Sequence, residues 1–124
     1  MAKKTKPGLK ITPELMALVY DFISECDPFS RWNMPHSEDV KFVVTRSRVT
    51  RGIYYKEGDK HVIGARINCC GWVYTLCEVI AHEMVHLHQN ATGQETPHAE
   101  HNAAFMKMAE EVCHSFGFHP HTFV

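Results

Sequence analysis

The sequence predicts an α+β domain with an N-terminal helix, a three-stranded and mainly antiparallel sheet, a long buried helix and a C-terminal helix. Three observations lead to this prediction. Apolar residues recur at helical spacing in residues 13–26, 73–90 and 101–116. Residues 40–68, between the first two of these stretches, are rich in β-branched and aromatic side chains. A chain of 124 residues is long enough for one domain with a modest core and too short for two.

The first helix is expected to begin at Thr12-Pro13-Glu14. A hydroxyl cap there precedes a proline at the first helical position and an acid in the first turn. The apolar residues that follow at spacings of three and four are Leu15, Leu18, Val19, Phe22 and Ile23. Asp27-Pro28 is expected to end this helix, and residues 27–38 are expected to form a loop.

Three strands are expected over residues 40–45, 49–56 and 60–68, which read VKFVVT, VTRGIYYK and KHVIGARIN. The segment EGD joins the last two and is typical of a hairpin turn, so at least these two strands are predicted to be antiparallel. The alternation of Arg and Tyr in residues 46–56 fits the solvent face of a half-buried sheet, and it also fits a strand that binds nucleic acid.

The second helix is predicted to start within residues 71–75 and to run to about Asn90. Thr75 and Glu78 have the spacing of a capping box. This helix is apolar nearly all round, which is typical of a central, buried helix. A polar loop follows it, and the third helix is expected over about 101–116, ending at Gly117. The apolar stripe of the third helix consists of Phe105, Met108, Ala109, Val112, Cys113 and Phe116.

The second helix carries the segment His82-Glu83-Met84-Val85-His86, an HExxH arrangement. Residues four apart stand on one helix face, so His82 and His86 present two imidazoles that one tetrahedral zinc ion can bridge. Glu83 is rotated about 100° from His82 and can reach the open side of such a metal without binding it. Two imidazoles and a carboxylate would be costly in a buried helix that bound no metal. The motif therefore predicts a zinc site with Glu83 as a general base.

A catalytic zinc needs a third protein ligand and one open position. Downstream of the motif, His98, Glu100 and His101 are all candidates for this ligand. His101 begins the third helix, where packing would fix it, whereas His98 and Glu100 belong to the loop. His88 lies only two residues from His86, points to a different face of the helix, and is expected at the surface or behind the ligands.

The segment HEMVH, followed after 14 residues by HNAAF, resembles the SprT-like zinc metallopeptidases, which include the Spartan proteases of DNA–protein crosslink repair. The resemblance covers roughly residues 12–118 and implies a zincin-like fold. It also implies that His101 is the third zinc ligand and that Phe105 is a packing residue. Asn102 stands where that family usually has glycine.

The resemblance further implies a zinc-dependent peptidase with one Zn²⁺ per chain, held by His82, His86 and His101. Glu83 would be the catalytic residue, and DNA-associated proteins are one class of substrate that the family suggests. Extended substrate is expected to bind along an exposed sheet edge above the HExxH helix. Tyr54 or Tyr55 is a candidate oxyanion donor.

Two other functions compete with that of a peptidase. The first is a catalytically silent zinc-binding adaptor for nucleic acid or a protein partner, and the intact Glu83 argues against it because a structural site needs no such carboxylate. The second is a non-proteolytic hydrolase that uses the same zinc. Residues 1–66 carry 12 of the 13 Lys and Arg residues against 8 acids. This excess of positive charge predicts weak, salt-sensitive DNA binding, and the simpler interpretation is that these charges are only solvated.

The chain ends and the cysteines complete the sequence predictions. Residues 1–11 are interpreted as a flexible basic arm and 12–118 as the peptidase domain. Residues 119–124 are expected to form a frayed C-terminal tail, and the alternative is that His119 and His121 fold back on the site. The five cysteines include no CxxC pair and are expected to be reduced, and residues 1–10 have no apolar signal segment, so the expected location is the cytoplasm without membrane association. The remaining histidines, expected at the surface or in the tail, are His36, His61, His114, His119 and His121.

Overall fold

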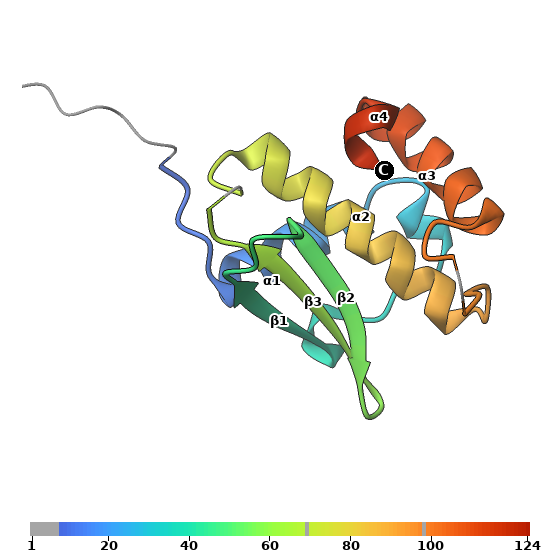
Figure 1. The fold of residues 1–124 in the computed structure, drawn as a ribbon, viewed down its shortest axis with the longest axis horizontal. Helices are drawn as coiled ribbons and strands as arrows, with labels where there is room; N and C mark the ends of the chain where they lie inside the picture. Colours follow the sequence, from blue (N-terminus) through green and yellow to red (C-terminus); the bar gives the residue numbers. More distant parts are fainter. Residues whose placement is uncertain (1–7, 69, 98) are drawn as a thin grey trace, which may run out of the picture.

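The computed structural model describes residues 8–68, 70–97 and 99–124, and within these residues the chain is an α+β domain, as predicted (Figure 1). The helices are α1 (Pro13–Ser24), α2 (Val73–Ala91), α3 (Ala103–Phe116) and α4 (Pro120–Phe123), and the strands are β1 (Val40–Thr45), β2 (Gly52–Glu57) and β3 (Lys60–Arg66). Two short 3₁₀ turns lie between α1 and β1, at Phe29–Arg31 and Ser37–Asp39. No helix in the described part of the chain is long and apolar enough to cross a membrane.

The sheet has the order β1-β3-β2 and is mixed, so the expectation of a mainly antiparallel sheet is wrong. β2 and β3 form the predicted antiparallel hairpin, with Gly58 at a φ of 63° in its turn. β1 pairs with the other side of β3 and runs parallel to it. β1 and β2 therefore both flank β3, which is the most buried strand, and β2 is an edge strand.

The start of α1 is as predicted, and its buried face is predicted only in part: Ile23 is buried, and Leu15 and Val19 pack partly buried against the core. Thr12 Oγ1 accepts a hydrogen bond from the backbone N–H of Leu15 (3.1 Å), which caps the helix. The residues packed in the core are Met16, Tyr20 and Ile23, while Leu18 and Phe22 are 67% and 61% exposed. Tyr20 decides the orientation, because its ring packs edge-on against Phe42 and its hydroxyl donates to the Pro35 carbonyl (2.6 Å).

α2 is the central element of the core, as its sequence predicts. It packs against β2 and β3 on one side and against α3 on the other (Figure 1). Its N-cap residue is Trp72, whose side chain makes no capping hydrogen bond. Thr75 lies inside the helix, so the predicted capping box at Thr75 and Glu78 is wrong. Glu78 is instead 3% exposed and points into the protein.

The two chain ends also differ from a simple arm and tail. Residues 1–7 of the predicted basic arm lie outside the described residues. Within residues 8–11, the Leu9 N–H donates to the Gly71 carbonyl (3.3 Å) and Ile11 is buried. At the other end, the expectation of a frayed tail is wrong. Residues 120–123 form α4, and Phe123, which is 1% exposed, stacks on Phe118.

Candidate metal centre

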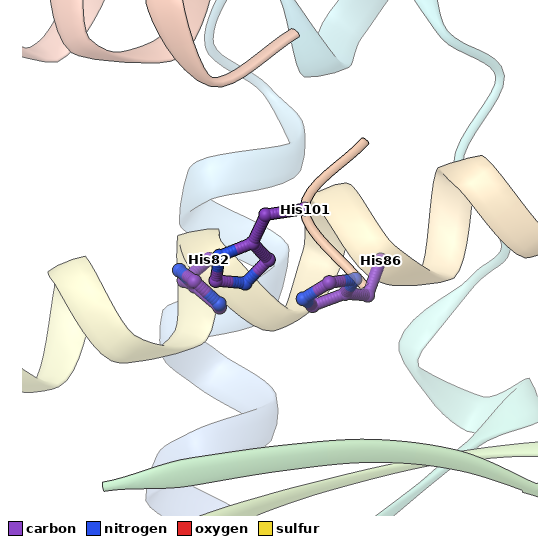
Figure 2. Close-up of side chains that lie close together, drawn as sticks. All are labelled: His82, His86 and His101. Atoms are coloured by element: carbon purple, nitrogen blue, oxygen red, sulfur yellow. The ribbon is translucent and has the colours of Figure 1, made fainter. Parts of the chain in front are cut away.

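Three histidines predicted to bind a metal converge on one point of the structure (Figure 2). His82 and His86 extend from successive turns of α2, and His101 comes from the segment just before α3. Their ligand atoms all lie within 4.8 Å of one another, so the cluster can hold one metal ion. Glu100 lines the adjoining cleft outside this cluster, and His98 lies outside the described residues.

The protonation of the cluster suits metal binding. Burial lowers the pKa of His82 to about 4 and lowers the pKa of His86 as well, so both imidazoles are neutral at pH 7. His82 Nδ1 donates to the carbonyl of Phe123 (2.6 Å), which leaves the lone pair of His82 on Nε2. His86 Nδ1 lies 3.3 Å from Gln89 Oε1, and the same tautomer follows. The donor set consists of three imidazoles, and His82 and His86 have their outer nitrogens held by hydrogen bonds, which fits a metal ion that prefers nitrogen ligands.

A buried amide network connects the two segments that carry the histidines. Gln89 is 1% exposed, and its Nε2 donates to Asn102 Oδ1 (2.8 Å) and to the Gln94 carbonyl (3.2 Å). Asn102 Oδ1 also accepts from the Phe105 N–H (2.9 Å) and thereby caps α3. Asn102 has a φ of −73°, so the backbone there does not require glycine. The one local signal for this network in the sequence is Asn102 itself, because asparagine is a favoured N-cap.

Phe105 forms the wall behind the histidines. It is fully buried, and its ring stacks on His101 at 4.3 Å and on His86 at 4.5 Å between centroids. His88, in contrast, stacks on Trp32 at 4.5 Å with an interplanar angle of 6° and takes no part in the cluster. His88 therefore holds the loop after α1 against α2.

Glu83 lies beside the histidines without joining their cluster. It is 6% exposed, and its Oε2 is 4.0 Å from His82 Nε2. Burial, with a smaller contribution from Glu100 and against the opposing effect of Arg51, raises the pKa of the Glu83 carboxyl to about 8. A cation held by the histidines would lower this pKa again, because an opposite charge at such a distance favours the carboxylate.

Glu83 and the three histidines line a cleft of about 790 Å³, and strand β2 forms one of its walls. The Arg66 N–H donates to the Arg51 carbonyl, so the backbone groups of Arg51 point toward β3. Backbone groups alternate in direction along an antiparallel strand, and those of Gly52 and Tyr54 therefore point outward, to the free edge of the sheet. Tyr54 also lines the cleft, its hydroxyl is hydrogen-bonded to His61 Nδ1 (2.6 Å), and burial raises the pKa of this hydroxyl. Tyr55 does not line the cleft and is 38% exposed.

Replacing Gly52 with alanine is expected to destabilise the protein by about 1–3 kcal/mol through overpacking. A methyl group at this position would lie 2.6 Å from Val79 Cγ1 and 2.8 Å from Glu83 Oε2. Chemical denaturation of Gly52→Ala would measure the effect. Gly8→Ala is the matched control, because a methyl group there meets nothing within 4 Å. Equal denaturation midpoints for the two variants would contradict the close approach of β2 to α2.

No protein-family model matches this chain, and no curated protein sequence matches it either.

Proposed function

We propose that this domain is a zinc-dependent metallopeptidase of SprT-like, zincin-like type. The observation that carries the proposal is the place of Glu83, a buried carboxylate next to a three-histidine cluster, in a cleft bordered by a free strand edge. A metal-binding cluster alone fits an adaptor equally well. The nearby carboxylate and the open cleft favour hydrolysis, because a purely structural zinc site is closed by four protein ligands.

His82, His86 and His101 would hold the zinc ion, which when bound acts as a Lewis acid and makes water a nucleophile near neutral pH. Glu83 would take the proton from the attacking water and later give it to the leaving amine. The Tyr54 hydroxyl stays protonated because burial raises its pKa, and it would supply a hydrogen-bond donor to substrate when His61 Nδ1 is the donor in the bond between them. Phe105 and the Gln89–Asn102 network hold the imidazoles in place during these steps.

Substrate would bind as an extended segment along β2. The outward-facing backbone groups of Gly52 and Tyr54 lie on the free edge next to Glu83, and they offer the hydrogen bonds of an added strand. This mode recognises the peptide backbone, so it suits unfolded or extended protein chains better than small non-peptide esters or amides.

The wild-type protein is expected to contain one zinc ion per chain and to lose hydrolysis on treatment with a chelator, with activity restored by added zinc. Elemental analysis and a cleavage assay would measure both. The substrates should be unfolded casein, the chain itself, and a protein in the presence of DNA. This range is needed because SprT-like peptidases resemble enzymes that are inactive until they are activated. A protein that keeps its zinc and cleaves none of these substrates would favour the adaptor function.

A basic hollow of about 410 Å³ supports nucleic-acid binding as a second candidate function. It is lined by Arg46, Ser47, Arg48, Arg66 and Asn68. In the part of the chain that the structure describes, neither Arg46 nor Arg48 forms an ion pair with an acid. Such a surface can contact the phosphates of a nucleic acid, either in an adaptor or beside an active peptidase.

Single-stranded DNA is expected to bind weakly, with an affinity that falls as salt is raised. Fluorescence anisotropy at several salt concentrations would measure this. A double variant, Arg46→Gln with Arg48→Gln, should weaken binding. It should also reduce the slope of log affinity against log salt concentration by about 0.7 for each phosphate contact that is lost. No binding of single- or double-stranded DNA in low salt would rule out this partner.

A further inference from the structure

α2 carries a buried acid that the proposed chemistry does not use. Glu78 precedes His82 by four residues, so the two side chains stand on the same face of α2. Glu78 is 3% exposed, and a buried carboxylate is costly unless it is paired. Its partners come from two distant segments of the chain, Arg51 before β2 and Thr122 in α4.

The contacts between these three residues close a ring. The Thr122 hydroxyl has two acceptors for its one proton, Glu78 Oε2 (2.9 Å) and the His119 carbonyl (3.0 Å), and Arg51 Nη1 lies 3.5 Å from Glu78 Oε1. Arg51 Nη2 donates to the backbone carbonyl of Thr122 (2.8 Å). Thr122 is thus held at both its hydroxyl and its carbonyl.

The residue after Thr122 touches the metal cluster. The Phe123 carbonyl accepts the hydrogen bond from His82 Nδ1 (2.6 Å), and the Phe123 ring packs against the His82 ring with 5.5 Å between centroids. α4 has only four residues, and a helix of that length is not stable by itself. The position of the Phe123 carbonyl therefore depends on contacts such as those that hold Thr122.

We propose that Glu78, Arg51 and Thr122 form a C-terminal clamp that positions the His82 imidazole for metal binding through the carbonyl of Phe123. The inference rests on the proposed metal site. The three residues act here as positioning residues, although Arg51 also lines the cleft. With the clamp loosened, α4 frays, His82 loses its acceptor, and the proton of the neutral ring is free to move to Nε2, where it blocks the ligand lone pair.

The main test is Thr122→Val, which keeps the shape of the side chain and removes the hydroxyl donor. Zinc affinity, measured by competition with a chromogenic chelator, is expected to fall by at least about 10-fold, as found when groups that orient metal ligands are lost. The absorption spectrum of the cobalt-loaded protein should change as well. Thr45→Val is the matched control, because Thr45 lies on β1 and away from the cluster, and it should change neither readout.

Glu78→Gln is a second variant with an intact acceptor for Thr122 but no charge for Arg51, and Glu110→Gln on the exposed side of α3 is its control. Glu78→Gln should also lower the zinc affinity, and it provides the test if Thr122→Val fails to fold. If the clamp only stabilises the fold, both clamp variants should unfold at a lower midpoint while their zinc affinity and cobalt spectrum stay unchanged. That result would overturn the proposal.

Imidazole ¹⁵N NMR of the metal-free protein tests the clamp independently of hydrolysis and of metal binding. His82 should be in the Nδ1–H form in the wild type and in a mixture of tautomers in Thr122→Val. If the wild type binds no zinc, the peptidase proposal fails, and the tautomer of His82 still decides whether the clamp orients the ring. A His82 signal that is unchanged in both clamp variants would contradict it.

Discussion

Replacing Glu83 with glutamine is expected to lower the rate of peptide hydrolysis by about 10²–10⁴-fold while zinc and fold are retained. Glutamine has nearly the volume of glutamate, so it fits the space beside Gly52, but it cannot take a proton from water. The carboxylate is not part of the histidine cluster, and metal content should therefore not change. The measurement is the cleavage rate of an unfolded protein substrate, together with metal analysis of the same sample.

Glu110→Gln makes the same chemical change on the exposed side of α3 and is the control for this comparison. Its cleavage rate should equal that of the wild type. Equal rates for Glu83→Gln and the wild type would show that Glu83 is not the base. Loss of zinc from Glu83→Gln would instead show that the carboxylate is a ligand.

His101→Ala is expected to weaken zinc binding by more than the roughly 10–100-fold caused by losing a group that only orients a ligand. Two imidazoles from α2 would remain, and they do not complete a tetrahedral site. Metal analysis after dialysis against a weak chelator would measure the loss.

Two other histidine variants sharpen the test of His101. His114→Ala changes an exposed residue of α3 and should keep its zinc. His98→Ala should keep it too. If His98→Ala loses the metal and His101→Ala keeps it, the third ligand is His98 and the alignment of this segment with the SprT-like pattern is wrong.

Local sequence signals predicted the elements well, and long-range packing explains where they failed. The cap at Thr12, the hairpin of β2 and β3, and the stripe of α3 depend on residues close in sequence, and the structure agrees with each. The parallel pairing of β1 with β3 has no such local signal. Leu18 and Phe22 fit a helical stripe as well as Met16 and Tyr20 do, and only the packing of Tyr20 on Phe42 selects the buried face.

The candidate site divides in the same way. His82, Glu83 and His86 follow from helical spacing alone, whereas His101 came from the resemblance to a family and was one of three candidates by residue type. Glu78 was predicted to cap a helix end and is instead joined to Thr122, 44 residues away. The bond from His82 to Phe123 spans 41 residues. Single polar residues at such separations leave no periodic pattern in a sequence.

The cluster joins two parts of the chain that meet only in the folded protein, α2 and the segment before α3. An ion held there would bind the native chain and not the unfolded one, so it would act as a ligand that stabilises folding. At a free concentration about 1,000-fold above its Kd, such a ligand adds about 4 kcal/mol to the free energy of unfolding. The lifetime of the protein among proteases would then depend on metal supply as well as on its hydrophobic core.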